Sequence, residues 1–341
     1  MRVDHPLNRR GVVAAKTERG RLQHTSPWGR RAICLAAAAS SATPALVAQP
    51  DIPPATPPDY TVAFLGDQGW GLETRLVLRL VAARAQLLVV LGDFDYLDDP
   101  ARWEAILSTE LGPEFPVIAV VGNHDVLAWT EYQALLEAHT LRSGVRCRGD
   151  IGVNAVCIHG GVQFVTSGVG TLGFDHVRHL RESLAGRDAI WRVCAWHKPR
   201  RLMQVGGKLN EVPWEAYDTC RRGGAIIASG HEHSYSRTYL MRSFVGLEFE
   251  ATPVLRVGSG ANFAFVSGLG GRSVRHQVDA LAANPWWAAV YTADQGARPG
   301  ALFCRFNAAG EQRRAICHFR DIAGNEPDRF EVISENYPRS G

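Results

Sequence analysis

The sequence of 341 residues lacks several features that would point to a specific class of protein. It has seven cysteines but no Cys-x-x-Cys pair, which argues against a zinc ribbon or a thioredoxin-like site. Its net charge of +3 is too small to indicate nucleic-acid binding. It has no internal repeat and no strongly apolar run of the roughly 20 residues that a membrane-spanning helix needs. With 46% hydrophobic and 21% charged residues, we expect a globular chain with a sizeable core.

The basic excess is confined to the N-terminal segment. Residues 1–48 hold eight Lys/Arg and two Asp/Glu, so the remainder has 29 basic and 32 acidic residues. A polar, Arg-rich stretch is followed by the uncharged stretch 32–50, with a small residue at Ala48. This order is typical of a signal peptide, so we predict that residues 1–48 are removed and the protein is periplasmic or extracellular. A membrane anchor or a disordered tail is the alternative, although the stretch is only weakly apolar.

Six cysteines remain when Cys34 of the N-terminal segment is set aside. An even number of cysteines in an exported chain suits disulfides. Two pairs each flank a turn and could join a hairpin, which leaves the last two cysteines for each other. The three pairs are Cys147 with Cys157, Cys304 with Cys317, and Cys194 with Cys220, and buried free thiols are the alternative for each pair.

Apolar runs and helical periodicity alternate along the chain from residue 61 to its end, without a convincing domain break. Residues 49–60 are rich in Pro, Asp and Thr and predict a linker, so we expect one catalytic domain over 61–341. The predicted helices are 72–85, 100–110, 129–139, 175–184 and 212–222. The predicted strands are 61–65, 87–91, 117–121, 155–159, 163–167, 190–195 and 225–229, followed by 235–241, 254–257, 301–306, 313–319 and 330–333.

Five of these apolar runs end directly in polar residues. In open α/β sheets, ligands bind at the carboxyl ends of the strands, so we expect five segments to deliver their polar residues to one edge of one sheet. Taken singly, a Gly-Asp after a strand is usually a turn, and a lone histidine is usually structural. The residues brought together in this way are Asp67, Asp93, Tyr96, Asn123, His124, His197, His231 and His233.

These side chains offer only oxygen and imidazole nitrogen as donors. That donor set suits Zn, Fe or Mn rather than soft metals. There are too many donors for one ion and about enough for two, and a carboxylate can bridge such a pair. Two ions about 3.5–4 Å apart are the arrangement that supports in-line displacement at phosphorus.

The order of the five motifs resembles that of calcineurin-like metallophosphoesterases, and more narrowly that of purple acid phosphatases. The broader superfamily has Asp-x-His in its first motif, whereas Gly69 stands at the histidine position here. Purple acid phosphatases share this omission and supply a tyrosine through Gly-Asp-x-x-Tyr, where Tyr96 lies. The motifs are Gly66-Asp67-Gln68-Gly69, Gly92-Asp93-Phe94-Asp95-Tyr96, Gly122-Asn123-His124-Asp125, Cys194-Ala195-Trp196-His197 and Gly230-His231-Glu232-His233.

The resemblance implies an α/β fold of the α+β type, a four-layer αββα sandwich of two mixed sheets flanked by helices. It also implies a ferric ion and a divalent ion, Fe, Zn or Mn, with Asp93 as the bridge. His124 would lie beside the substrate phosphate as general acid or electrostatic stabiliser. The implied ferric ligands are Asp67, Asp93, Tyr96 and His233, and the implied divalent ligands are Asp93, Asn123, His197 and His231.

The implied function is that of an exported acid phosphatase. It would hydrolyse phosphate monoesters of small molecules by in-line attack of a metal-bound hydroxide, with no nucleic-acid partner and no stable membrane anchor; the oligomeric state is open. A phosphodiesterase or nucleotidase with the same metals is one alternative. A non-hydrolytic metal- or phosphate-binding protein, or an iron redox protein, is another, although metal binding alone does not require His124.

Lysine is scarce after the N-terminal segment. Residues 49–341 contain only Lys198 and Lys208, both in the stretch that follows His197. They could form a cationic rim that binds the substrate phosphate. The alternative is that they are ordinary surface residues of an Arg-rich chain, and Arg200 and Arg201 rank no higher.

Two features of the C-terminal third have ambiguous patterns. Residues 258–271 are rich in Gly and Ser, and we predict a loop bordering the metal cleft. Trp286, Trp287 and Tyr291 could line a pocket, but we expect them to pack in the core.

Overall fold

The computed structural model describes residues 54–186 and 189–337, which all fall within one compact unit, 50–341. The predicted signal peptide, residues 1–48, lies outside the described residues. Of the predicted linker, Thr56 is buried and Tyr60 is the first residue of a strand. Within the described ranges, no helix is long and apolar enough to cross a membrane.

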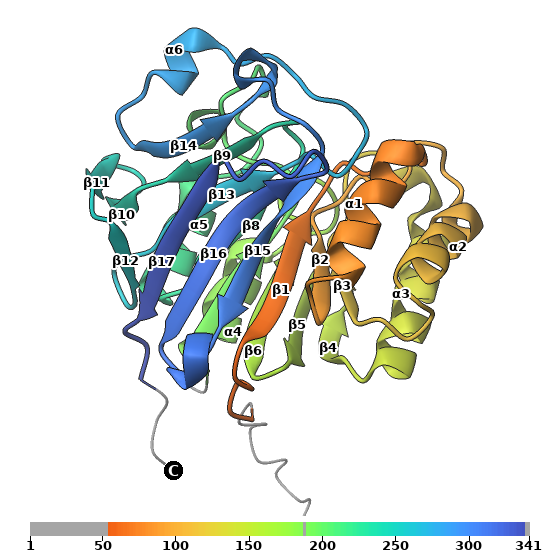
Figure 1. Ribbon diagram of the computed structural model, residues 1–341. Helices are drawn as coiled ribbons and strands as arrows, with labels where there is room; N and C mark the ends of the chain where they lie inside the picture. Colours follow the sequence, from red (N-terminus) through yellow and green to blue (C-terminus); the bar gives the residue numbers. More distant parts are fainter. Residues whose placement is uncertain (1–53, 187–188, 338–341) are drawn as a thin grey trace, which may run out of the picture. The chain divides into compact units, whose positions relative to one another are not determined.

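The first sheet is mixed and has seven strands (Figure 1). Its β1, β2 and β3 run parallel, β1, β15, β16 and β17 pair antiparallel in turn, and β12 is parallel to β17. In spatial order its strands are β12 (Val254–Val257), β17 (Asp328–Ser334), β16 (Arg314–Asp321), β15 (Gly300–Phe306), β1 (Tyr60–Leu65), β2 (Leu87–Val90) and β3 (Val117–Ala119).

The second sheet has eight strands, with β6, β7, β8 and β13 parallel and the remaining pairs antiparallel. A separate hairpin is formed by β10 (Leu240–Ser243) and β11 (Glu248–Glu250). In spatial order the second sheet consists of β14 (Trp287–Tyr291), β9 (Tyr235–Thr238), β13 (Ala264–Ser267), β8 (Ile226–Ser229), β7 (Trp191–Ala195), β6 (Val162–Ser167), β5 (Asn154–His159) and β4 (Arg146–Asp150).

Helices cover the outer faces of both sheets. Three pack on the β1–β3 part of the first sheet, namely α1 (Leu72–Ala82), α2 (Pro100–Glu110) and α3 (Trp129–Ser143). Two pack on the second sheet, α4 (His176–Ala185) and α5 (Trp214–Arg222). The short elements are α6 (Asp279–Ala282) and the 3₁₀ turns η1 (Val126–Ala128), η2 (Arg201–Met203), η3 (Ala293–Gln295) and η4 (Ala308–Gly310).

Three buried apolar clusters separate these layers. Strand β1 shows how, because side chains alternate across a strand. Val62 and Phe64 belong to the cluster between the two sheets, whereas Ala63 and Leu65 belong to the cluster beneath α1 to α3. A third cluster lies between the second sheet and α4 and α5. The predicted four-layer αββα sandwich is therefore confirmed.

The described part of the chain contains the three predicted disulfides. Cys147–Cys157 joins β4 to β5 and Cys304–Cys317 joins β15 to β16, in each case between residues paired in the sheet register. Cys194–Cys220 joins β7 to α5 on the outer side of the second sheet.

The structure corrects two predicted elements. Residues 258–271 are not only a loop, because they contain β13, which pairs with both β8 and β9. The predicted strand 235–241 is two strands, β9 and β10. Trp286, Trp287 and Tyr291 are buried in the core, as expected.

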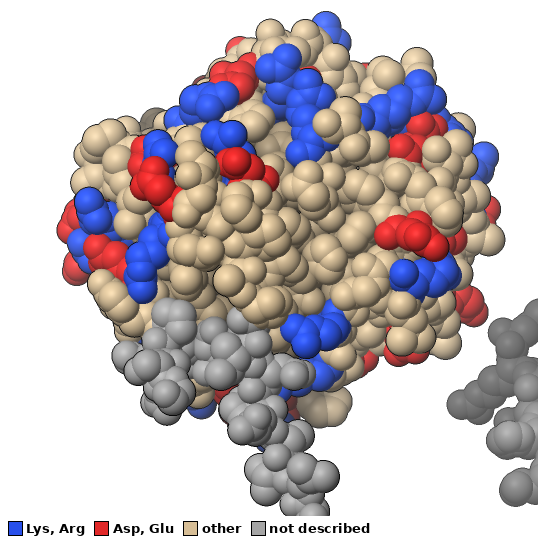
Figure 2. Space-filling view, turned by 60° about the horizontal axis from the view of Figure 1, so that its bottom comes forward, with Lys and Arg blue, Asp and Glu red and all other residues tan. Residues whose placement is uncertain are grey.

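Charged side chains are mixed on the surface. On the face shown in Figure 2, basic and acidic side chains are interspersed around a broad uncharged area. This distribution agrees with the small net charge of the chain.

Candidate metal centre

The predicted site residues come from two sheets rather than one, which corrects the expectation of a single sheet edge. Asp67, Asp93 and Asn123 follow β1, β2 and β3 of the first sheet, and His197 and His231 follow β7 and β8 of the second. The two sheets face each other, and their strand ends meet at the same side of the molecule. The sequence pattern shows only that each strand ends in polar residues, which does not distinguish one sheet from two.

Three of the predicted ferric ligands form a tight triangle. The Tyr96 hydroxyl oxygen lies 3.1 Å from Asp67 Oδ1 and 3.0 Å from His233 Nε2. Asp67 Oδ1 and His233 Nε2 lie 3.3 Å apart. Donors held about 2.0–2.2 Å from one ion lie about 3 Å from each other, so the triangle has the spacing of a metal-ligand set.

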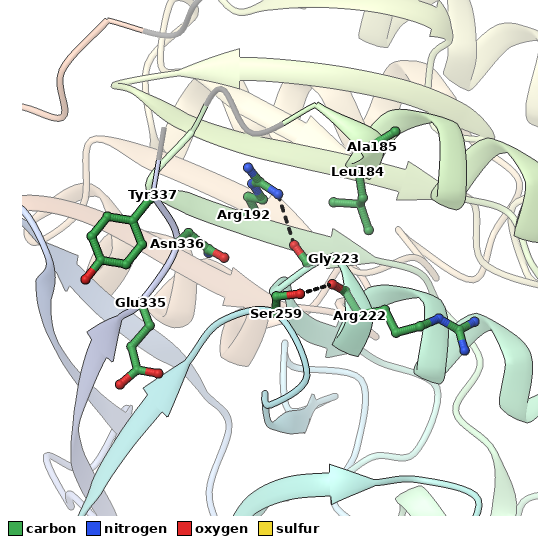
Figure 3. A pocket seen from close by; sticks show the side chains of 9 residues that line it. All are labelled: Leu184, Ala185, Arg192, Arg222, Gly223, Ser259, Glu335, Asn336 and Tyr337. Atoms are coloured by element: carbon green, nitrogen blue, oxygen red, sulfur yellow. Dashed lines mark hydrogen bonds between the residues drawn. The ribbon is translucent and has the colours of Figure 1, made fainter. Parts of the chain in front are cut away.

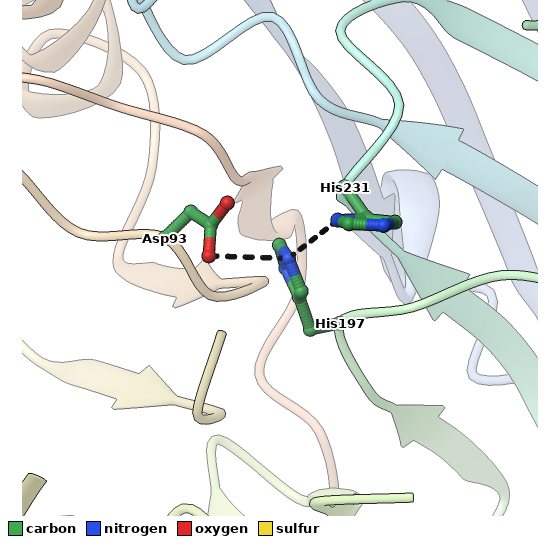
Figure 4. A group of neighbouring side chains, drawn as sticks. All are labelled: Asp93, His197 and His231. Atoms are coloured by element: carbon green, nitrogen blue, oxygen red, sulfur yellow. Dashed lines mark hydrogen bonds and ion pairs between the residues drawn. The ribbon is translucent and has the colours of Figure 1, made fainter. Parts of the chain in front are cut away.

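The predicted divalent ligands form a second cluster around His197 Nε2. This nitrogen lies 3.2 Å from Asp93 Oδ1, 3.2 Å from Asn123 Oδ1 and 3.1 Å from His231 Nδ1. Figure 4 shows how Asp93 and His231 approach it from opposite sheets. The cluster is buried, with His197 inaccessible to solvent and Asp93 only 1% exposed.

The second cluster requires a positive charge at its centre. His197 Nδ1 lies 2.7 Å from the carbonyl oxygen of Leu91, so Nδ1 carries the hydrogen and Nε2 presents its lone pair. His231 Nε2 faces Glu211 Oε2 at 3.2 Å, which likewise leaves a lone pair on Nδ1. Lone pairs of two imidazoles, a carboxylate and an amide then converge, and only a cation or a proton stabilises that arrangement.

The pKa shifts of the two histidines also indicate that the cluster is stabilised by one positive charge. Burial opposes a charge on His197, but the charge and hydrogen bond of Asp93 raise its pKa to about 9. Burial, then the charges of His197 and Lys208, lower the pKa of His231 to about 2. The ligand atoms of Asp93, His197 and His231 all lie within 4.8 Å of one another, so these three residues could hold a metal ion, which would supply the positive charge without a proton.

Asp93 links the two clusters. It contacts His197 in the second cluster, and burial followed by the charges of Asp67 and Asp93 raises the pKa of Tyr96 in the first. Burial disfavours the carboxylate form of Asp93, but His197 lowers its pKa well below the ordinary range. Asp93 thus contacts the second cluster and acts electrostatically on the first, which is compatible with its predicted role as the bridging ligand.

The backbone of this site is strained at the ligands themselves. Ten described non-glycine residues have positive φ, and four of them are Asp67 (60°), Asp93 (56°), Tyr96 (61°) and His231 (68°). Such conformations cost free energy and persist where the surrounding structure imposes them, most often at functional sites.

The glycines that precede the ligands are required by close packing. A Cβ on Gly92 would lie 2.6 Å from His197 Nδ1, and a Cβ on Gly122 would lie 2.1 Å from the backbone nitrogen of Asp93. Side chains at these positions would push the ligand loops apart. The glycine in each of these two motifs therefore has a steric role.

Three supporting residues were not predicted as site residues. Buried Asp125 accepts hydrogen bonds from the backbone nitrogens of Asp93 (2.9 Å), Phe94 (2.8 Å) and Gly122 (2.6 Å), and so joins two ligand loops. Glu211 contacts His231 Nε2, and Ser273 Oγ lies 2.5 Å from His233 Nδ1. Asp125 belongs to the Gly-Asn-His-Asp motif and could have been found there, whereas no local pattern marks the other two.

His124 lies at the solvent side of both clusters. Its backbone nitrogen donates to Asp93 Oδ1 at 3.0 Å, and its ring centroid is 4.5 Å from that of Tyr96. The side chain is exposed, unlike the buried histidines of the second cluster. It is therefore placed to meet a substrate rather than to complete the buried ligand set.

The two lysines have different surroundings. Lys198 Nζ lies 2.5 Å from Glu211 Oε1, so its charge is neutralised by the carboxylate that also contacts His231. Burial, and then the charge of Arg275, lower the pKa of Lys208 below its ordinary value, and the charges of Glu232, Asp67 and Asp93 oppose this shift only in part. Lys208 is thus in the electrostatic field of the metal ligands, and Lys198 reaches them through Glu211.

A cavity of about 180 Å³ lies at the other end of the second sheet (Figure 3). It is lined by Arg192 near the start of β7 and Gly223 before β8, with Ser259 and Asn336 nearby. None of the predicted site residues lines it. The candidate site is therefore the cluster at the carboxyl ends of the strands.

Comparisons with known proteins identify the family and agree with the fold. A sequence model of the calcineurin-like phosphoesterase family matches residues 60–235, a range that includes the predicted ligands from Asp67 to His233. A search of curated proteins finds no match. Solved structures similar in fold include a purple acid phosphatase from yellow lupin (Lupinus luteus) seeds, at 14% identity and a TM-score of 0.60. That similarity covers 82% of this chain and 55% of the lupin protein, so the chain spans little more than half of its length. A structure of PhoD is also similar, at 14% identity and a TM-score of 0.48, over 85% of this chain and 74% of that one.

Proposed function

Because the chain belongs to the calcineurin-like phosphoesterase family, we propose that it is an exported binuclear-metal hydrolase of phosphate monoesters. The observation that carries the proposal is the pair of donor clusters joined through Asp93. Donors of this type and number fit two ions of the Zn, Fe or Mn kind. Such a pair supplies an activated water and neutralises phosphate charge, the chemistry required for in-line displacement at phosphorus.

The proposed ions are a ferric ion, held by Asp67, Tyr96 and His233, and a divalent Fe, Zn or Mn ion, held by Asn123, His197 and His231. Asp93 bridges them. The position of the Tyr96 hydroxyl, 3.1 Å from Asp67 Oδ1 and 3.0 Å from His233 Nε2, supports the trivalent assignment, because a phenolate is a hard anionic donor that favours a trivalent ion. Only a strongly polarising cation can hold that oxygen as a phenolate.

In this proposal, the protein positions the ester and moves the proton of the leaving group. His124, exposed beside Asp93 and Tyr96, donates a proton to the departing oxygen. The charges of Asp67 and Asp93 act on Lys208, and we propose that this lysine binds the phosphate group. Lys198 holds Glu211 in place against His231 and so contributes indirectly.

Export is supported by the disulfides rather than by the N-terminal segment, which lies outside the described residues. Three disulfides in one compact unit are rare in a reducing compartment and common in the periplasm or outside the cell. The three disulfides are therefore compatible with an exported protein whose signal peptide is removed.

The test is turnover of a matched ester pair together with metal analysis. Purified protein should release 4-nitrophenol from 4-nitrophenyl phosphate faster than from bis(4-nitrophenyl) phosphate, and should contain about two metal ions per chain. Faster cleavage of the bis-ester would make it a phosphodiesterase. Two bound ions without turnover of either ester would make it a non-hydrolytic metal protein.

A further inference from the structure

A second cavity lies directly beside the first metal cluster. It has a volume of about 270 Å³ and lies between the loop after β1 and the loop after β13. A cavity of this size has room for one small ring system and not for a polymer. Its lining residues are Gly69, Trp70, Gly71, Leu72, Glu73, Gly271 and Arg272.

Trp70 is the notable side chain of this cavity. It lies three residues after the ligand Asp67, and it is 46% exposed although tryptophan is usually well buried. The guanidinium of Arg102, on α2, lies over its ring at 5.0 Å from the centroid. The indole is therefore supported from helix α2 and still exposes a large part of its surface, which makes it a stacking surface for a planar ligand.

Arg272 connects the cavity to the metal ligands. Its backbone nitrogen donates to the carbonyl oxygen of Asp67 at 3.0 Å, and its guanidinium lies 4.8 Å from the centre of the Tyr96 ring. The Tyr96 hydroxyl in turn lies 3.1 Å from Asp67 Oδ1. The same side chain thus lines the cavity and places a fixed positive charge beside the first cluster.

The charged side chains that line the cavity limit the net charge of the ligands that it can bind. The lining contains one carboxylate, Glu73, and one guanidinium, Arg272, so the cavity has no excess positive charge to attract a second anionic group. Leu72, 67% exposed, adds apolar surface next to Trp70. The chemistry suits a neutral aromatic ring attached to a single phosphate.

We propose that this cavity is the subsite for the esterified group, and that it takes the ring of an aryl phosphate stacked on Trp70, with Arg272 against the phosphate. This rests on the proposed function and adds the substrate class. The subsite makes aryl monoesters better ligands than alkyl monoesters of the same charge.

The test measures binding, which does not depend on turnover. Phenylphosphonate and methylphosphonate, which are not hydrolysed, are titrated into the full-length metal-containing protein by isothermal calorimetry. Stacking on an aromatic side chain contributes about 0.5–1.5 kcal/mol, so phenylphosphonate should bind about twofold to twelvefold more tightly. Trp70→Ala should abolish this preference, and Trp70→Phe should restore most of it.

Two further variants separate the parts of the proposal. Arg272→Gln should weaken binding of both phosphonates by a similar factor and leave their ratio unchanged. Phe174→Ala removes an aromatic side chain that is 80% exposed and does not line the cavity, so the preference should remain. Thermal melting of each variant checks that the fold is intact.

The possible results are distinct. An equal affinity of the wild-type protein for both phosphonates, or a preference that survives in folded Trp70→Ala, overturns the subsite. A preference lost equally in Phe174→Ala also overturns it, because the selectivity would then be a general surface effect. Failure of the proposed function appears separately, as absence of turnover of any phosphate ester.

Discussion

Tyr96 has two roles that can be separated at the level of one atom. Its ring packs against His124 and beneath Arg272, whereas its hydroxyl lies among Asp67 and His233. Only the hydroxyl is needed as a ligand. Removing the oxygen while keeping the ring therefore tests the ferric assignment without disturbing the packing.

We predict that the iron-loaded protein is purple to pink, because a phenolate bound to ferric iron absorbs visible light, and that Tyr96→Phe loses the colour. A visible spectrum measures this, and activity should persist in part. The matched control is Tyr132→Phe, in which a buried tyrosine loses its hydrogen bond to Asp95 and the colour should remain. Colour retained in Tyr96→Phe, or a colourless wild type, would leave two divalent ions as the assignment.

Substitutions of His124 and of Asp93 are predicted to have different effects on metal content and activity. His124→Ala should keep both metal ions and lower kcat by about 10²- to 10⁴-fold, the usual effect of removing a positioned acid. Asp93→Asn should lower metal content and activity together, because Asp93 contacts His197 in the second cluster and its charge acts on Tyr96 in the first. Metal analysis beside steady-state kinetics distinguishes the two, and a His124→Ala protein without metal would contradict the role given to His124.

The conformation of the loops at the carboxyl ends of the strands depends on glycine residues as well as on the predicted ligands. Gly268 and Gly270 show that backbone segments approach too closely there for any side chain. A Cβ on Gly268 would lie 2.1 Å from the carbonyl oxygen of Glu232, and a Cβ on Gly270 would lie 2.4 Å from the carbonyl oxygen of Gly66. The Gly-rich composition of 258–271 therefore reflects close approach of backbone segments beside the site. This is why composition alone predicted a loop there and missed β13.

Helix α4 makes the stability of the fold dependent on pH. Its His179 is half-buried against the second sheet, with Nε2 3.1 Å from the carbonyl oxygen of Thr166, and partial burial lowers its pKa. Burial also lowers the pKa of His176, one turn away. The unfolded chain therefore binds these protons more readily than the folded chain below about pH 6.5, the ordinary histidine pKa.

We predict that the free energy of unfolding falls as the pH is lowered from 7 to 5, since stability rises with pH wherever the unfolded state binds more protons. His179→Gln, which keeps an N–H donor, should make this fall shallower in urea titrations at several pH values. The control is His276→Gln, whose side chain is 78% exposed. An unchanged slope in His179→Gln would mean that other groups dominate the pH dependence.

For the whole molecule, the sequence predicted the layers better than the supporting contacts. Continuous apolar runs such as 87–91 mark strands that are buried on both faces, and this pattern is visible without a structure. Glu211, Ser273 and Arg272 contact the predicted ligands from loops far away in the sequence, and no periodicity encodes such contacts. The division of the ligands between two sheets is likewise a property of packing and not of any single segment.

Export remains a prediction for the intact chain. N-terminal sequencing of the native protein should give a first residue after about position 45, because the uncharged stretch 32–50 ends in small residues. Cell fractionation should place this shortened protein outside the cytoplasm. Intact Met1 in a cytosolic fraction would contradict the prediction.

The division of the ligands between the two sheets has a consequence for the order of assembly. Synthesis delivers Asp67, Asp93 and Asn123 well before His197 and His231, and neither group alone completes either cluster. The first sheet also lacks β15 to β17 until the last part of the chain is made. The proposed ion pair is thus incorporated late, after the two sheets have packed together. The bound ions would then cross-link the two sheets.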